Sequence, residues 1–169
     1  MYQEPWVVAG QGFSNRISGR LLVHCFIMMF MGFFGGFAWL IALADNVFHI
    51  LPLPRIEIAV PDQKELLRNA HTGPLMNAMY VMLMVALSPR LHFSVTQAKW
   101  VYYGAIVMLW GNLVGYVAAV YAPERGLQPV GDWPNLLSYG AFYAAVVGAT
   151  IATGIILNNA IRAARNKTT

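Results

Sequence analysis

Charged residues are scarce in this chain of 169 residues, of which they make up only 11%. Soluble domains average about 25% charged residues, whereas hydrophobic residues reach 58% here. The single cysteine, Cys25, allows no disulfide within the chain and no cysteine pair for a metal. We therefore exclude a disulfide-stabilised or zinc-stabilised domain, expect a buried inert thiol at Cys25, and interpret the chain as an integral membrane protein.

The sequence also lacks the short motifs that mark common soluble catalytic sites. Gly-x-Ser-x-Gly, His-Glu-x-x-His, a P-loop and a dinucleotide fingerprint are absent. No acid lies within an apolar segment to orient a catalytic histidine, and the charges and broken helices typical of transporters are missing. Any function must therefore rest on the few polar residues of the apolar segments.

Four long apolar segments contain most of the hydrophobic residues, at about 21–43, 71–87, 100–121 and 136–157. Each is near the roughly 20 residues that a bilayer requires. The first exceeds the roughly 7 to 15 residues of a signal-peptide core, and the sequence begins at Met1, so we expect a span that is not removed. We predict an all-α fold, a four-helix bundle forming a single integral membrane domain over residues 1–169.

Lysines and arginines are distributed unevenly outside these segments, with seven on one side and four on the other. The positive-inside rule predicts that the richer side, which contains both termini, is cytoplasmic, and we expect a multi-pass protein of the bacterial inner membrane. The net charge of +4 follows from this topology, so no nucleic-acid partner is expected. The richer side has Arg16, Arg20, Arg90, Lys99, Arg162, Arg165 and Lys167; the other has Arg55, Lys64, Arg68 and Arg125, with six of the seven acids.

The first connection, residues 45–69, is the longest and contains Pro52, Pro54 and Pro61, which forbid a continuous helix. The alternation of apolar residues in 56–60 predicts a short extended segment. We expect this connection to cap the non-cytoplasmic ends of the helices.

Small residues recur in the first and last apolar segments, where they allow helices to approach closely. The same surfaces would allow the bundle to form a homo-oligomer. We expect helix contacts at Gly32, Gly35, Gly36, Gly148, Ala152 and Gly154.

His71 and Asn77 are polar residues at the start of the second apolar segment, where their burial costs free energy and indicates a functional site. A single imidazole can hold a haem iron and leave the opposite coordination position open. Of the four histidines, His71 is the best placed for a metal, at a helix start beside apolar sequence. Taken alone, however, a hydrogen-bonded structural histidine is the simpler interpretation.

A second polar cluster, Trp110, Asn112 and Tyr116, occupies the third segment. Asn112 and Tyr116 are four residues apart and share one helical face. They either join neighbouring helices by hydrogen bonds or line a cavity for a small polar ligand. Asn77 lies at a similar depth in the bilayer, which favours a shared cavity.

At these residues the sequence resembles the styrene oxide isomerase family. The family pattern Arg-x-Ala-His-x-Gly-Pro-x-x-Asn-x-Met is matched over 68–79, and a second pattern is matched over 110–127 without an insertion between the two blocks. The similarity also extends, more loosely, over 24–39. The matched residues are Arg68, Ala70, His71, Gly73, Pro74, Asn77 and Met79, then Trp110, Asn112, Tyr116, Pro123, Arg125, Gly126 and Leu127.

The resemblance implies a homotrimeric membrane enzyme that uses haem b, with ferric iron as a Lewis acid, to isomerise aryl epoxides to aldehydes. This Meinwald rearrangement converts styrene oxide to phenylacetaldehyde by ring opening and a 1,2-hydride shift. It further implies contact with membrane lipid and, as a partner, a styrene monooxygenase that forms the epoxide. Carried over by position, His71 is the haem ligand, Tyr116 and Asn77 face the substrate, and the other candidates for cofactor binding are Arg68, Trp110, Asn112 and Arg125.

Two other functions are compatible with the residues. In a cytochrome b-like electron carrier, His71 and a second histidine such as His24 would both bind the iron. In a non-enzymatic assembly subunit, the polar groups would only join helices. A low-spin bis-histidine spectrum would identify the first, and the absence of Soret absorption would favour the second.

Overall fold

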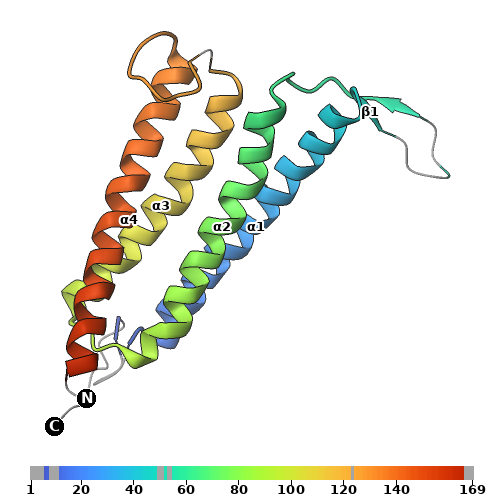
Figure 1. Ribbon diagram of the computed structural model, residues 1–169. Coiled ribbons are helices and arrows are strands. Elements are labelled where there is room, and N and C mark those ends of the chain that lie inside the picture. Colours follow the sequence, from blue (N-terminus) through green and yellow to red (C-terminus); the bar gives the residue numbers. More distant parts are fainter. Residues whose placement is uncertain (1–5, 8–11, 49–51, 53–54, 123, 166–169) are drawn as a thin grey trace.

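The computed structural model describes residues 6–7, 12–48, 52, 55–122 and 124–165, and its fold is dominated by four long helices (Figure 1). All four are long and apolar enough to cross a membrane, which confirms the predicted all-helical membrane class. The elements are α1 (Asn15–Leu43), β1 (Val47–Phe48), β2 (Ile56–Glu57), α2 (Lys64–Leu87), the short 3-10 helix η1 (Ser88–Arg90), α3 (Val95–Val120) and α4 (Trp133–Arg165).

The helices extend beyond the apolar segments from which they were predicted. Most notably, α2 begins at Lys64, so His71 lies two turns inside a helix, and its predicted position at a helix start is wrong. Hydropathy marks the stretch that suits lipid, but a helix continues as long as its backbone hydrogen bonds do. The polar turns between Lys64 and Asn69 therefore belong to α2 although they are not apolar.

Local signals explain where the helices begin and end. The Ser14 side chain accepts a hydrogen bond from Ile17 N at the start of α1. Ser94 and Gln97 form a reciprocal capping box at the start of α3. Pro89 lies in η1, directly after α2, and Pro134 lies in the first turn of α4, where its missing N–H costs nothing.

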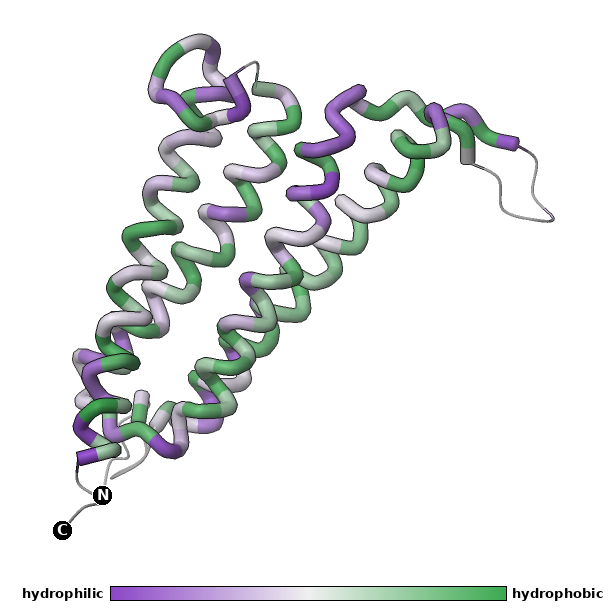
Figure 2. Tube along the Cα trace, viewed as in Figure 1, coloured by the Kyte–Doolittle hydropathy of each residue, from purple (hydrophilic) through white to green (hydrophobic). Residues whose placement is uncertain are grey.

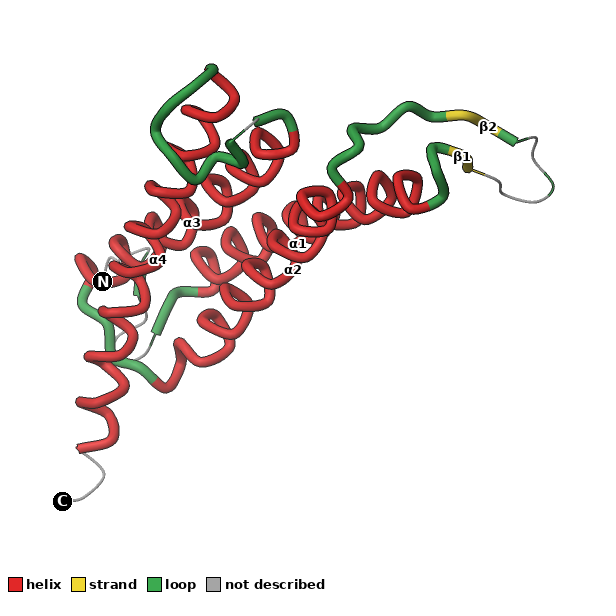
Figure 3. The backbone as a smooth tube through the Cα atoms, turned by 45° about the horizontal axis from the view of Figure 1, so that its top comes forward, coloured by secondary structure: helices red, strands yellow, loops and turns green. Residues whose placement is uncertain are grey.

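The helices form two antiparallel hairpins, α1 with α2 and α3 with α4, which approach each other at one end and diverge at the other (Figures 1 and 3). The main apolar core fills the end where they converge, around Ile17, Met28, Val81 and Leu109. Cys25 is fully buried in this core as a free thiol, as predicted.

Charge separates along the helix axes, and polar residues concentrate at the two ends of the molecule (Figure 2). We call the end where α1 begins and α4 ends the basic end, and the opposite end the acidic end. The basic end contains Arg16, Arg20, Arg90, Lys99, Arg162 and Arg165. The acidic end contains Asp45, Glu57, Asp62, Glu65, Glu124 and Asp132 together with the cations Arg55, Lys64, Arg68 and Arg125.

Glycines bring α1 and α2 together at the level of Pro74. A Cβ at Gly35 would lie 2.6 Å from the carbonyl oxygen of Ala70, and one at Gly32 would lie 2.9 Å from the Leu75 side chain. Because Pro74 has no N–H, the Ala70 carbonyl receives no helical hydrogen bond from it. The predicted contacts at Gly32 and Gly35 are therefore confirmed, and they let α1 approach that carbonyl directly.

In α4, Gly148 packs against Gly104 of α3, whereas Gly154 has no atom within 4 Å of an added Cβ. The prediction that glycines of the fourth span make helix contacts thus holds at Gly148 and fails at Gly154 within one chain. A small residue permits close approach, but it does not determine which face of the helix meets a neighbour.

The connection between α1 and α2 contains the predicted extended segment. β2 pairs antiparallel with β1, with Val47 opposite Glu57 and Phe48 opposite Ile56. Asp45 and Asn46 turn the chain in the left-handed region, with φ of 53° and 65°. The hairpin projects sideways from the bundle (Figure 1), whereas Val60 of the same connection packs against the apolar cluster that includes Ala42 and Leu66, at the ends of α1 and α2. The expected cap is therefore present at Val60 and absent at the hairpin.

Candidate functional site

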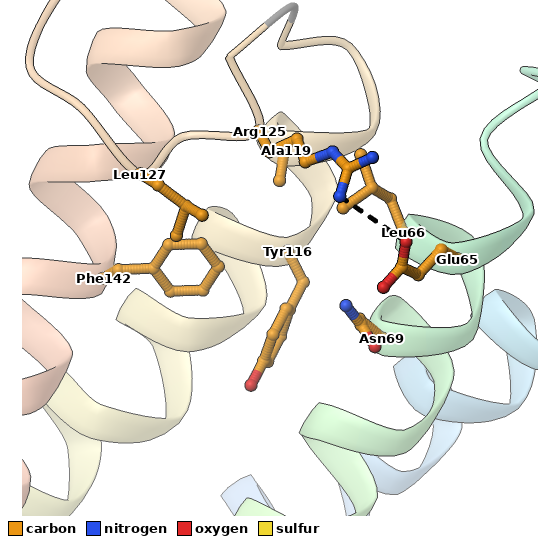
Figure 4. A pocket seen from close by; sticks show the side chains of 8 residues that line it. All are labelled: Glu65, Leu66, Asn69, Tyr116, Ala119, Arg125, Leu127 and Phe142. Carbon is orange, nitrogen blue, oxygen red and sulfur yellow. Dashed lines mark ion pairs between the residues drawn. The ribbon is translucent and has the colours of Figure 1, made fainter.

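A cavity of about 240 Å³ opens between the hairpins at the acidic end, where they diverge. Its α2 side is polar, and its α3 and α4 sides are apolar and aromatic (Figure 4). The volume is below the roughly 300 Å³ at which pockets for drug-sized ligands begin, which favours a small ligand. The lining residues are Glu65, Leu66, Asn69, Tyr116, Ala119, Arg125, Leu127 and Phe142.

Tyr116 is the central side chain of this cavity. Its ring packs on the α2 backbone, since a Cβ at Gly73 would lie only 2.1 Å from Tyr116 Cε2. On the other side it meets Phe142 edge to face, with ring centroids 5.1 Å apart. Its hydroxyl has no hydrogen-bond partner among the described residues. The ring is therefore fixed while the O–H remains available to a ligand.

Arg125, which the family resemblance offered as a candidate for cofactor binding, lies with Tyr116 in the cavity wall. It lies in the loop after α3 with φ of 56°, and its guanidinium is 3.5 Å from the Glu65 carboxylate of α2. Both side chains are more than half exposed, so this ion pair contributes at most about 1 kcal/mol. Its main consequence is geometric, because it links the two hairpins across the mouth of the cavity.

Buried polar groups hold this loop against α4. Asn135 is fully buried; its Oδ1 accepts the Gly126 N–H at 2.8 Å, and its Nδ2 donates to the Gln128 and Val130 carbonyls. Ser138 Oγ donates to the Gly115 carbonyl of α3 at 2.9 Å. Asn135 therefore attaches the loop that carries Arg125 and Leu127 to α4, while Ser138 joins α4 to α3.

Gly126→Ala should lower the melting temperature of the protein more than Gly131→Ala. Both glycines have positive φ, 67° and 90°, so both substitutions carry a backbone cost of about 1 kcal/mol. Only at Gly126 would the new Cβ also collide with Ser138 Oγ, 2.0 Å away, whereas Gly131 faces open space. Thermal unfolding in detergent measures the difference, and equal shifts would contradict the described packing of the loop.

Asn77 lies one helical turn beyond Gly73, on the side of α2 that faces α3. Because α3 runs antiparallel and Tyr116 packs on Gly73, this places Asn77 level with Asn112, one turn from Tyr116. The Asn77 Nδ2 is buried and has no hydrogen-bond partner within the described part of the chain. Such a donor costs about 1–3 kcal/mol if it stays unsatisfied. Asn77 is not among the residues that line the cavity, so the cavity expected to be shared by Asn77, Asn112 and Tyr116 contains only Tyr116 of the three.

His71 packs against α1. Its Nδ1 lies 2.8 Å from the Gly32 carbonyl oxygen, which can only accept, so Nδ1 carries the proton. Trp39 stacks on the ring with centroids 6.1 Å apart. A Cβ at position 36 would lie 2.6 Å from Nδ1, so Gly36 leaves the space that the ring occupies. Nε2 then keeps its lone pair, which is the arrangement of histidines that bind metals.

His71 and Tyr116 lie on nearly opposite sides of α2. Gly73 and Asn69 face Tyr116 and the cavity, and each is two residues from His71, about 160° around the helix. His71 is accordingly not among the residues that line the cavity. One chain thus brings Tyr116 and Arg125 together but separates them from the candidate metal ligand.

The remaining candidates lie outside the cavity lining. Trp110 Nε1 donates to His24 Nδ1 at 3.2 Å and joins α3 to α1. Arg68 is exposed on α2, and its carbonyl accepts from the Thr72 hydroxyl. Asn112 is half-buried.

The structure does not favour a bis-histidine site within one chain. His24 is eight residues before Gly32, the partner of His71, so the two histidines are about 12 Å apart along α1. Two nitrogens on one metal ion lie about 4 Å apart. His92 lies beyond the other end of α2, and His49 lies outside the described residues.

A sequence model of the family described as styrene oxide isomerase matches residues 17–161. The chain belongs to the styrene oxide isomerase family. A curated relative from Pseudomonas fluorescens, named styrene-oxide isomerase, is 29% identical over 119 residues. The aligned region covers 68% of this chain and 65% of that relative, so the chain spans slightly less than two thirds of the relative's length. Both sequence blocks that suggested the resemblance lie inside the region matched to the family.

Several residues that line the cavity or contact His71 were not predicted from the sequence. Glu65, Asn69 and Phe142 line the cavity, and Trp39 stacks on His71. A signal existed for Asn69, because Asn69, Gly73 and Asn77 repeat at four-residue intervals on one face of α2. No signal indicated Phe142, which resembles any lipid-facing aromatic residue in an apolar segment.

Proposed function

We propose that this protein is an epoxide isomerase that converts small aryl epoxides, such as styrene oxide, to aryl acetaldehydes. The proposal rests on two donors that have no hydrogen-bond partner among the described residues. Tyr116 O–H lines an aromatic cavity, and Asn77 Nδ2–H lies one helical turn from Gly73, on which Tyr116 packs. An aryl epoxide has the matching character, since it combines a flat apolar ring with a single oxygen acceptor. Membership of the family supports the same reaction class.

The residues around His71 fit a haem b. The His71 Nδ1–H is held by the Gly32 carbonyl, which fixes the tautomer and the ring plane. Gly36 leaves the space that the imidazole ring occupies. When bound, haem iron, which we expect to be ferric, would supply a Lewis acid that polarises the epoxide oxygen. In this proposal His71 is the ligand, and Arg68, Trp110, Asn112 and Arg125 remain candidates for contact with the cofactor.

Tyr116 and Asn77 would act on the reacting oxygen. As the benzylic C–O bond breaks, negative charge grows on oxygen, and donors already in place stabilise that charge without reorganising. The aryl ring stabilises the benzylic cation, a hydride moves to it from the neighbouring carbon, and the C–O bond becomes a carbonyl. Atoms and electrons balance within the substrate, so no reductant or oxidant is consumed.

The apolar wall would protect this reaction from water. Phe142 and Leu127 line the cavity opposite the polar side of α2 (Figure 4), which suits an aryl ring. Water that reached the cation would give a diol, so exclusion of water determines the product. The fixed loop carrying Leu127 therefore contributes to product selectivity.

The opposite orientations of His71 and Tyr116 support a site shared between two copies of the chain within a homo-oligomer, for which we propose a trimer. Large apolar side chains are exposed on every long helix, including Phe37 on α1 and Met76 on α2. Such surfaces face lipid or another subunit. Mixed oligomers of inactive His71→Ala and strongly impaired Tyr116→Phe subunits should be more active than oligomers of either variant alone, because some sites then contain both intact residues. Activity no higher than that of the Tyr116→Phe subunits alone would contradict a shared site.

The distribution of charge supports an orientation with the basic end in the cytoplasm of a bacterium, in the inner membrane. An epoxide made in the cytoplasm by a styrene monooxygenase would dissolve in that membrane and reach the enzyme.

Purified protein should convert styrene oxide to phenylacetaldehyde without added reductant, as followed by gas chromatography. A haem spectrum recorded on the same sample tests the cofactor separately. Formation of the diol alone, or no conversion by protein with a full complement of haem, would overturn the proposed reaction.

A further inference from the structure

We propose that a second cavity, between α1 and α3 at the basic end, binds the phosphate headgroup of an anionic phospholipid. This cavity has a volume of about 490 Å³ and lies at the far end of α1 from the Tyr116 site. Arg16, Gly19, Arg20, His24 and Tyr102 are among its lining residues. Basic cavities between membrane helices on the cytoplasmic side are suited to acidic lipid headgroups.

The polar groups of this cavity are predominantly donors. Arg16 and Arg20 are one turn apart on α1, so their guanidinium groups reach the same region. His24 Nδ1 accepts the Trp110 indole N–H at 3.2 Å, which leaves Nε2 to carry the proton of the neutral ring. Two guanidinium groups, an imidazole N–H and the Tyr102 hydroxyl match the several acceptor oxygens of a phosphate.

The protein supplies no counter-charge at this cavity within the described residues. Neither arginine forms a salt bridge there, and the described acids, such as Glu65 and Asp132, lie at the acidic end. Glu4 lies outside the described residues. Two exposed cations in one cavity repel each other, and an anion from outside the chain relieves that repulsion.

An apolar stripe leads from the arginines into the membrane. Val23, Phe30 and Phe34 are 59%, 64% and 66% exposed, and together with Arg16 and Arg20 they lie within about 80° on α1. Phe30 is about 15 Å along the helix from Arg20, which is half the thickness of the hydrocarbon core. The sequence of cations followed by an apolar stripe fits a phospholipid, with its acyl chain below its phosphate, and does not fit free phosphate.

The test uses the detergent-purified full chain with equal amounts of dioleoyl phosphatidylglycerol and dioleoyl phosphatidylcholine, with bound lipids counted by native mass spectrometry. The wild-type protein should retain phosphatidylglycerol preferentially. A double variant that combines Arg16→Gln and Arg20→Gln should reduce that preference about 25-fold, since each arginine contributes about fivefold. The matched control, Arg90→Gln with Arg162→Gln, removes two charges from the same end outside the cavity and should leave the preference within about twofold.

A second pair of variants tests the same cavity without removing any arginine. An added Cβ at Gly19 meets no atom within 4 Å, so both Gly19→Glu and Gly19→Gln fit the helix. Gly19→Glu places a negative charge among the arginines and should abolish the preference, whereas Gly19→Gln should keep it.

Three results would overturn the proposal. The first is an unchanged preference in the cavity variants, and the second is an equal loss in the Arg90 and Arg162 control, which would indicate general surface charge. The third is displacement of phosphatidylglycerol by an excess of inorganic phosphate, which would identify a free anion as the ligand. Failure of the proposed isomerase activity would leave all three measurements intact, because none of them involves the epoxide or haem.

Discussion

His71→Ala should yield protein that has neither Soret absorbance nor isomerase activity. The imidazole is the proposed iron ligand, and the same substitution removes its hydrogen bond to the Gly32 carbonyl. That neutral hydrogen bond contributes only about 0.5–1.5 kcal/mol, and alanine favours the helix, so the fold should persist. Absorbance per polypeptide, helicity by circular dichroism and turnover of styrene oxide are measured on one preparation.

His92→Ala is the matched control for this experiment. His92 is exposed in the connection between α2 and α3, so its removal should leave absorbance and turnover at wild-type levels. Retention of haem by His71→Ala, or loss of haem from His92→Ala, would contradict the ligand assignment.

Gly36→Ala tests the same site without changing the imidazole. The added methyl group would meet His71 Nδ1 at 2.6 Å, so the ring must rotate or α1 must move away. We expect a shifted or weakened Soret band, whereas Gly154→Ala, which faces open space, should have the wild-type spectrum.

Tyr116→Phe should keep the haem spectrum and lower kcat about 10²- to 10³-fold. This is the typical loss when one donor to a developing oxyanion is removed. The substitution retains the ring that packs on Gly73 and against Phe142, so the cavity should keep its shape and KM should change much less than kcat. Steady-state rates of phenylacetaldehyde formation separate the two parameters.

Tyr121→Phe is the control on the same helix. Tyr121 is 64% exposed at the C-terminal end of α3, so loss of its hydroxyl should leave kcat unchanged. Equal rates for Tyr116→Phe and the wild-type protein would remove Tyr116 from the mechanism, and loss of haem from Tyr116→Phe would assign it to cofactor binding.

The number and type of the helices could be predicted from the sequence, but not their ends. A membrane-spanning helix must satisfy its backbone within a long apolar segment, so hydropathy alone locates four of them. The N-terminal boundary of α2 was predicted seven residues late, at His71 and not at Lys64, because polar residues form helical hydrogen bonds as well as apolar residues do. Hydropathy therefore reports where lipid is tolerated and does not report where a helix begins.

For the candidate site, the sequence by itself determined which polar residues must be explained, because a polar group in an apolar segment is costly wherever it points. Only the tertiary structure decided which of them share a cavity. The loop after α3 brings Arg125 to Tyr116. Asn135 holds that loop, and Ser138 joins α4 to Gly115 of α3. His71 faces α1, on the side of α2 away from Tyr116. Depth in the membrane follows from position along the chain, whereas the direction of a side chain around a helix acquires meaning only when the neighbouring helices are in place.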